Sequence, residues 1–177
     1  MRKLKLEELG RANIETFKNQ EKTPIIIVLD NVRSAHNVGS VFRTADAFAL
    51  NKIYLCGITA TPPHKEISKT AIGATESIQW VFEKEIKTAI GALKTEGYKV
   101  IGVEQTTKTT LLQDFQIEKG EKIAIVMGNE VMGISDNILS ELDEVIEIPQ
   151  FGTKHSLNVS VCTGIVLWEL FKKMRLQ

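Results

Sequence analysis

The sequence predicts an α/β fold, in which a mainly parallel sheet is covered by helices on both faces. Two runs, Ile25–Leu29 and Ile123–Met127, are continuously apolar and rich in β-branched residues, as is typical of strands buried on both faces. Segments with helical periodicity separate these runs and further short apolar runs along the chain. Strands that alternate with helices in this way favour a parallel sheet.

The expected elements can be placed in order along the chain. An amphipathic helix is expected over residues 4–19, and Pro24 opens the first strand. The helix after that strand is expected over residues 38–49, with Asn37 as its N-cap. Further helices are expected over residues 66–71 and 86–96, the second ended by Gly97. The remaining elements are strands at 53–56, 77–82, 100–103, 123–127 and 145–148, a short helix from Ser135 to Leu142 and a final helix at about 157–173.

Length and composition predict a single domain over residues 1–177, with residues 1–22 as an N-terminal helical extension. With 43% hydrophobic and 25% charged residues, the chain can bury a core and stay soluble. No run approaches the roughly 20 apolar residues that a membrane span needs. The N-terminus mixes acidic with basic residues and lacks the apolar segment of a signal peptide. We therefore expect a cytoplasmic protein that does not contact a membrane.

The balance of charge excludes some binding functions. The chain has 22 basic and 22 acidic residues and therefore no net charge. A protein that coats nucleic acid without regard to sequence is strongly basic, so the charge balance argues against that function. A local basic patch remains possible, because several bases fall in or beside predicted loops: Arg33, His36, Arg43, His64, Lys65, Lys69, Lys154 and His155.

The two cysteines, Cys56 and Cys162, lie in apolar stretches. Neither has another Cys or a His at the spacing of metal ligands, so we interpret both as buried free thiols. No metal site is expected.

Three segments rich in Gly and Asn follow the ends of predicted strands: Asn37–Arg43, Gly128–Ile134 and Phe151–Ser160. We call them the first, second and third segments. Ligands of open α/β sheets bind outside the carboxyl ends of the strands. The working site is therefore expected where these three segments, each leaving a strand as a loop, come together.

The first segment combines features that suit a phosphate. A helix N-terminus at Asn37 offers free N–H groups, and Gly39 allows a close approach. Arg43 follows about one and a half turns later and interrupts a largely apolar helix, so a buried or interfacial partner is expected for it. The alternative for Asn37 is that it serves only as a helix cap.

The second segment resembles a glycine loop but lacks the G-x-G-x-x-G pattern and the G-K-[ST] of a P-loop, which speaks against a dinucleotide or nucleoside triphosphate site. Gly128 and Gly133 suit tight turns that present N–H groups to a small ligand. Glu130 is either a salt-bridge partner or an active-site carboxylate. In the third segment, Ser156 and Asn158 stand at the start of the last helix, and a cap explains only one of them.

The motifs in these segments resemble those of the SpoU/TrmH family of the SPOUT class. They read Asn37-x-Gly39-x-x-x-Arg43, then Gly128-Asn-Glu-x-x-Gly-Ile-Ser135, then Ile148-Pro-x-x-Gly with Ser156-Leu-Asn-Val-Ser160. They occur in the family's order and span residues 37–160. One departure is Val131, where the family usually has Gly.

The resemblance implies an S-adenosylmethionine-dependent RNA ribose 2′-O-methyltransferase. It implies a parallel α/β sheet whose C-terminal segment forms a deep trefoil knot, and a homodimer with its site near the interface. The implied cofactor contacts are Gln105, Gly128, Asn129, Ile148 and Leu157. The positions that match the reaction site are Arg43, Asn37, Glu130, Ser156 and Asn158.

These residue types suggest how the reaction would proceed. None of the three histidines, His36, His64 and His155, matches a catalytic position of the family. Because an arginine stays protonated at neutral pH, we expect Arg43 to grip a neighbouring phosphate and lower the pKa of the hydroxyl electrostatically. Ser156, Asn158 and Asn37 would hold the ribose and the loop.

Substrate choice stays open at this point. The short chain before the first strand slightly favours tRNA, a compact folded target, over rRNA, with recognition by the dimer surface and loops such as Pro62–Lys69. The alternative from another class is a non-catalytic RNA-binding protein that keeps the knot fold.

Overall fold

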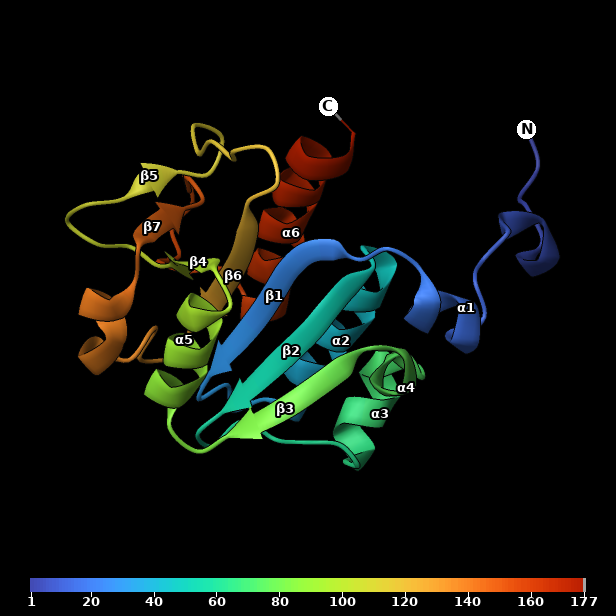
Figure 1. The fold of residues 1–177 in the computed structure, drawn as a ribbon, viewed down its shortest axis with the longest axis horizontal. Coiled ribbons are helices and arrows are strands. Elements are labelled where there is room, and N and C mark those ends of the chain that lie inside the picture. Colours follow the sequence, from blue (N-terminus) through green and yellow to red (C-terminus); the bar gives the residue numbers. More distant parts are fainter. Residues whose placement is uncertain (177) are drawn as a thin grey trace.

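The computed structural model describes residues 1–176 and contains one seven-stranded sheet with helices on both faces (Figure 1). The strands lie in the order β3-β2-β1-β6-β4-β7-β5, and every neighbouring pair is parallel. Their bounds are β1 (Thr23–Asp30), β2 (Leu50–Cys56), β3 (Gln79–Glu83), β4 (Tyr98–Val103), β5 (Thr110–Leu111), β6 (Lys122–Met127) and β7 (Glu144–Glu147). The predicted parallel α/β architecture is confirmed.

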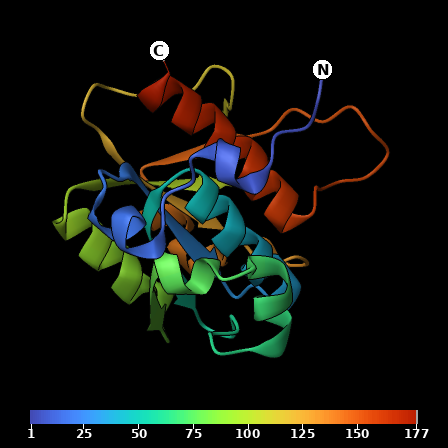
Figure 2. The same ribbon diagram turned by 90° about the vertical axis from the view of Figure 1, so that its right-hand side faces the viewer.

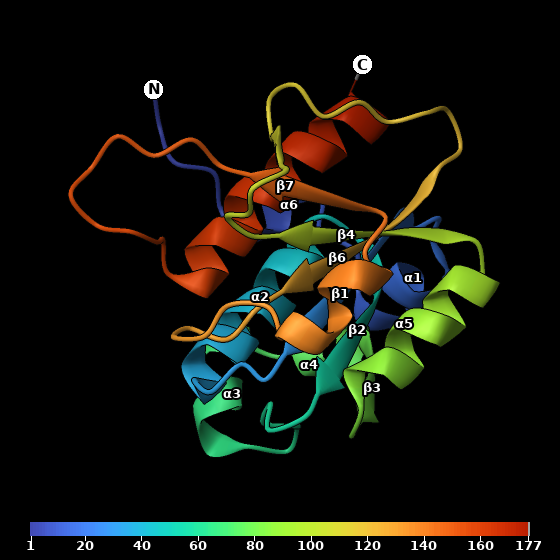
Figure 3. The same cartoon turned by 90° about the vertical axis from the view of Figure 1, so that its left-hand side faces the viewer.

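Helices cover both faces of this sheet. They are α1 (Ile14–Asn19), α2 (Ala35–Ala47), α3 (Lys65–Ala71), α4 (Ala74–Ser77), α5 (Ile86–Thr95) and α6 (Val159–Arg175), with 3-10 helices η1 (Leu6–Leu9) and η2 (Asp136–Glu141). Figure 3 shows α2 and α6 on one side of the strands and α5 on the other. None of the helices in residues 1–176 is long and apolar enough to cross a bilayer.

The two strands at the centre, β1 and β6, explain the apolar runs in the sequence. Ile25 to Leu29 are fully buried, because alternate side chains enter two different cores. Ile27 packs with α2 and α6 on one face, while Ile26 and Val28 pack with α5 on the other. A strand buried on both faces needs no polar alternation, so the continuous run is the expected pattern.

Two helix predictions were wrong in their bounds. The helix expected over residues 4–19 is broken into η1 and α1, because Gly10 adopts a left-handed conformation (φ 59°) and Asn13 starts a new helix as its N-cap. The helix expected from residue 38 begins at Ala35, with Ser34 as the N-cap that accepts the N–H of Asn37. The first segment is therefore part of α2 and not a loop.

Smaller differences concern short elements. The helix expected from Ser135 to Leu142 is the 3-10 helix η2, with Ser135 at its N-cap position. The sequence analysis missed α4 and the two-residue strand β5. The other strands and helices lie within a few residues of their expected places, and Gly97 follows α5 with a positive φ of 82°.

The order of the strands determines which loops meet. Leu29 of β1 is in register with Met127 of β6, and Val103 of β4 is in register with both Met127 and Ile146 of β7. The carboxyl ends of these four strands therefore lie at one edge of the sheet. Beyond β7 the chain forms an exposed loop, which projects from the body of the molecule in Figures 2 and 3 before it enters α6.

Candidate functional site

A cavity of about 670 Å³ opens at this edge, between the segments that follow β4, β6 and β7 and the start of α6. All five residues expected to contact a cofactor line it: Gln105, Gly128, Asn129, Ile148 and Leu157. Glu130, Ser156 and Asn158 line it too. The strand order explains why these residues meet. Because β4 lies between β6 and β7, the segments that follow the three strands are neighbours at the carboxyl edge of the sheet.

The second segment forms a tight turn that needs both of its glycines. Asn129 and Gly133 exchange two backbone hydrogen bonds of 2.9 Å, and the Asn129 side chain accepts the N–H groups of Val131 and Met132. A Cβ on Gly128 would lie 2.2 Å from the carbonyl carbon of Gly133, which itself has φ 69°. Val131 is 71% exposed, so this departure from the family pattern leaves the turn intact.

Two carboxylates fix the end of the second segment. Glu104, which the sequence analysis missed, accepts the N–H of Gln105 at 2.8 Å and that of Ile134 at 3.0 Å. Asp30 is fully buried and accepts the N–H of Ser135 at 2.7 Å. The only signal for them in the sequence was that each acid stands at the end of a strand.

A hydrogen-bonded chain joins all three segments. The Glu130 carboxylate accepts the backbone N–H of Arg33 (2.9 Å) and of Ser34 (3.0 Å), and also the Asn37 side-chain amide (2.9 Å). The amide oxygen of Asn37 in turn accepts the Asn158 side-chain N–H at 3.1 Å. Asn37 therefore does not serve only as a helix cap, because its side chain bridges the second and third segments.

These contacts set the charge state of Glu130. Burial raises the pKa of its carboxyl, but the hydrogen bonds from Arg33, Asn37 and Ser34 outweigh burial and hold the pKa below its ordinary value. Glu130 is accordingly an ionised acceptor at neutral pH. Its geometry suits the task of holding the start of α2 against the second segment.

Acid should remove this contribution of Glu130. A lowered pKa means that the ionised carboxylate stabilises the fold above its unfolded pKa of about 4.3, and that this stability is lost as the pH falls through the lower folded value. We expect wild type to unfold at a higher temperature than Glu130→Gln at pH 7, and this difference in unfolding temperature to shrink as the pH falls below the unfolded pKa of about 4.3. Thermal unfolding followed by circular dichroism measures these temperatures. Glu141→Gln, at an exposed glutamate, serves as the control. A difference between wild type and Glu130→Gln that does not change with pH would contradict the proposed contribution of the ionised Glu130.

The third segment is anchored at two points, at His155 and at the C-terminal end of its exposed part, Asn158. The Asn158 side chain caps α6 by accepting the N–H groups of Ser160 and Val161. The Gln105 side chain donates to the carbonyl oxygen of His155 at 3.2 Å, across the cavity mouth. Ser156 is exposed on the cavity wall between these two anchors.

Arg43 lies apart from this network. It is six residues after Asn37 on α2, hence about 9 Å along the axis and about 120° around it. Its side chain is exposed, does not line the cavity and has no hydrogen bond or ion pair within residues 1–176. The buried or interfacial partner expected from the sequence is thus not found within the described part of this chain.

Both cysteines are free, but only Cys56 is buried as expected, whereas Cys162 is half-buried. Cys56 is buried, and burial raises the pKa of its thiol to about 12. Cys162 borders the cavity, and burial raises its pKa to about 11, so neither thiol is ionised at neutral pH. No set of three His, Cys, Asp or Glu side chains within residues 1–176 is placed to hold a metal ion.

Comparison with known proteins gives a consistent result. The model of the SpoU rRNA Methylase family matches residues 24–168. The 23S rRNA (guanosine-2′-O-)-methyltransferase RlmB of Neisseria meningitidis is 30% identical over 155 residues, which are 88% of this chain and 61% of that protein. The chain thus spans about three fifths of the length of this relative.

Solved structures agree with this relationship. The S-adenosylmethionine-bound rRNA methyltransferase of Sinorhizobium meliloti is similar at 27% identity and a TM-score of 0.78, over 85% of this chain and 56% of that one. The TrmH/SpoU tRNA modifying enzyme of A. aeolicus is similar at 25% identity and a TM-score of 0.78, over 90% and 79%. The chain belongs to the SpoU rRNA Methylase family.

Proposed function

We propose that this chain is an S-adenosylmethionine-dependent methyltransferase that acts on a ribose 2′-hydroxyl of RNA. The observation that carries the proposal is the cavity at the carboxyl edge, joined to the first segment by the hydrogen-bonded chain from Glu130 through Asn37 to Asn158. The names of its relatives support the same activity, since RlmB is a guanosine-2′-O-methyltransferase.

The cavity suits the proposed cofactor in size and charge. Its volume of about 670 Å³ is within the range of small-molecule sites. Four carboxylates line it, Glu104, Glu130, Asp136 and Glu147, and none of the described lining residues is Lys or Arg. S-adenosylmethionine carries a sulfonium and an ammonium against one carboxylate, so this acidic wall matches its net positive charge.

The backbone of the second and third segments would hold this ligand. Gly128, Ile148 and Leu157 would contact the cofactor, together with Asn129 and Gln105. When bound, S-adenosylmethionine supplies an activated methyl group. Ser156 and Asn158 would orient the ribose. Asn37 would hold the third segment in place beside the second through its hydrogen bond with Asn158. Arg43 would bind the adjacent phosphate and stabilise the charge that develops as the 2′-hydroxyl loses its proton.

A homodimer would bring Arg43 to a cavity. On α6, Val161, Ile165 and Trp168 are spaced by four and three residues and are 52%, 40% and 49% exposed, so they form an apolar stripe. Because α2 packs against α6, a second copy seated on this stripe would lie beside Arg43. We propose that the working site combines the cavity of one copy with Arg43 of another.

The remaining family features are also proposals. We propose that the segment from β7 to α6 forms the trefoil knot, which is supported by the contact of Gln105 with the third segment. Residues 1–177 would form one domain, with residues 1–22 as an extension that packs through Phe17. We propose a cytoplasmic enzyme whose substrate is tRNA, with rRNA as the alternative.

Three measurements test these proposals. Isothermal titration with S-adenosylmethionine is expected to show one site per chain, and sedimentation should show a dimer that Trp168→Glu dissociates. Methyl-labelled cofactor should then label tRNA from cells that lack the gene. Label in rRNA alone would overturn the preference for tRNA, while a failure to bind the cofactor would favour a non-catalytic RNA-binding protein.

A further inference from the structure

A second surface, outside the cavity, is rich in basic side chains. Residues 31–45 and 57–73 contain one acid, Glu66, although the whole chain has equal numbers of acids and bases. The bases of these stretches are all exposed and lie on α2 and α3 or just before them: Arg33, His36, Arg43, His64, Lys65 and Lys69. We call this group the α2–α3 basic surface.

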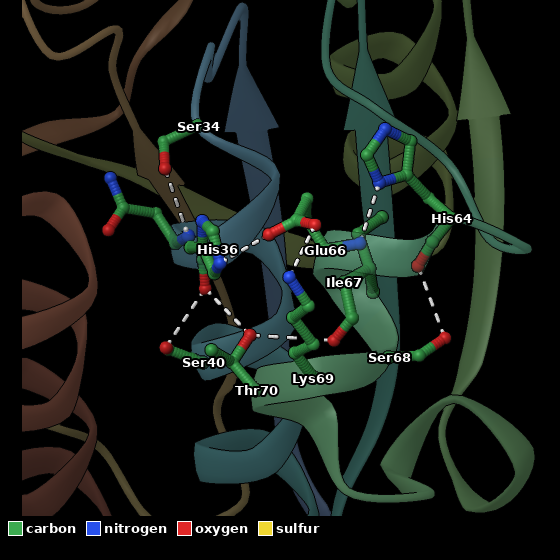
Figure 4. A network of polar contacts seen from close by, with 10 residues as sticks. Ser34, His36, Ser40, His64, Glu66, Ile67, Ser68, Lys69 and Thr70 are labelled. Carbon is green, nitrogen blue, oxygen red and sulfur yellow. Dashed lines mark hydrogen bonds and ion pairs between the residues drawn. The ribbon is translucent and has the colours of Figure 1, made fainter.

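Close packing of the two helices brings these bases together. A Cβ on Gly39 of α2 would lie 2.1 Å from the Thr70 hydroxyl and 2.3 Å from the Ile67 carbonyl oxygen of α3. The hydroxyls of Thr70 and Ser40 both donate to the carbonyl oxygen of His36 at 2.9 Å (Figure 4). The contact at Gly39 fixes the position of α3 on α2, so the packing of the two helices determines where the bases lie relative to one another.

The single acid of this surface holds two of its bases. One Glu66 oxygen lies 2.6 Å from His36 Nε2 and the other lies 2.7 Å from Lys69 Nζ (Figure 4). The Glu66 backbone N–H also donates to His64 Nδ1 at 3.1 Å. Glu66 therefore holds His36 across the gap between the helices and Lys69 on its own helix, and its backbone N–H holds the side chain of His64.

Arg43 continues the same surface along α2. His36, Ser40 and Arg43 follow one another at spacings of four and three residues, so they lie on one stripe of the helix. Ser40 and Thr70 share an acceptor, which places this stripe beside α3. The residue that we assign to phosphate binding in the reaction thus lies at one end of a larger basic surface.

The charge of this surface is opposite to that of the cavity. Glu104, Glu130, Asp136 and Glu147 line the cavity, and they would repel a phosphate backbone. The boundary between the two regions is the first turn of α2, where Asn37 contacts Glu130 and Asn158. A polyanion held on the basic surface would therefore stay outside the acidic cavity of its own copy, and in the proposed homodimer Arg43 would present its ribose at the cavity rim of the partner copy.

We propose that the α2–α3 basic surface docks the RNA backbone next to the nucleotide that is methylated, and that Glu66 positions His36 and Lys69 for this contact. The inference rests on the proposed function, and it adds the surface through which the RNA is held. Two lysines, Lys65 and Lys69, would each contact a phosphate. Contacts of this kind raise affinity without regard to sequence, and they weaken with salt.

The test compares two double variants that remove the same charge. Lys65→Gln/Lys69→Gln alters the surface, while Lys87→Gln/Lys119→Gln alters exposed lysines on α5 and before β6. Filter binding of bulk tRNA is measured at several salt concentrations. We expect the surface variant to lower the slope of log affinity against log salt by about 1.5, since each lost phosphate contact contributes about 0.7 to 0.9. The control should keep the wild-type slope.

Titration with S-adenosylmethionine on the same samples separates this inference from the proposed function. All variants are expected to bind the cofactor as wild type does. Equal slopes for the two double variants would overturn the docking surface, whether or not the cofactor binds. Equal competition by poly-glutamate of matched charge would also overturn it, in favour of an acidic protein partner. A wild type that binds no cofactor would instead refute the proposed function alone.

Discussion

Arg43→Ala is expected to slow methyl transfer by about 100- to 1000-fold at saturating RNA, the loss typical of removing one group that stabilises charge in a transition state. The side chain is exposed and has no hydrogen bond or ion pair within residues 1–176, so its removal should change stability by less than about 0.5 kcal/mol. Its removal should also leave cofactor affinity unchanged, because Arg43 does not line the cavity of its own copy and is assigned to the RNA phosphate in the cavity of the partner copy. Single-turnover kinetics and isothermal titration measure the two effects separately.

Two further variants make this prediction specific. Arg43→Lys keeps the charge but loses the planar fork that binds phosphate, so an intermediate rate is expected. Arg11→Ala removes an exposed arginine of the N-terminal segment and should have no effect on the rate. A near-wild-type rate for Arg43→Ala would show that the arginine has no part in the reaction.

Gly128→Ala is expected to weaken cofactor binding strongly. The new Cβ would lie 2.2 Å from the Gly133 carbonyl carbon and 2.3 Å from the Ile134 nitrogen. Both are backbone atoms, so the whole turn must shift. Overpacking of this kind costs about 1 to 3 kcal/mol, which corresponds to a loss of affinity of about 5- to 150-fold if the cost falls on the bound form.

A matched glycine provides the control. Gly91 lies within α5, and a Cβ there would meet nothing within 4 Å. Gly91→Ala should bind S-adenosylmethionine as wild type does and be slightly more stable, since alanine is the better helix former. If Gly128→Ala bound the cofactor with unchanged affinity, the second segment would not form the binding site.

The sheet could be predicted because its signal is local. The apolar run Ile25–Leu29 is buried on both faces. Such burial requires apolar residues at consecutive positions, and this pattern can be recognised in the sequence. The start of α2 was less clear, because Ser34 and Asn37 are both good N-cap residues, only three positions apart. Asn37 instead uses its side chain for Glu130 and Asn158, which are distant in sequence.

The parts of the site that were missed depend on such distant contacts. Glu104 has no pattern of its own, since its role comes from the N–H of Ile134 in another segment. The N-terminal helix was predicted from an apolar periodicity that continues through Gly10, where the backbone turns left-handed. The position of Arg43 away from Asn37 follows from helix geometry only once the start of α2 is known.

The central claim is most directly tested by nucleoside analysis after the reaction. Wild-type protein, S-adenosylmethionine and RNA from cells that lack the gene are incubated together, and the RNA is digested to nucleosides for mass spectrometry. We predict one new nucleoside with the methyl group on the ribose, formed about 100- to 1000-fold more slowly with Arg43→Ala. A methyl group on a base, or no methyl transfer by a wild type that binds both cofactor and RNA, would contradict the account.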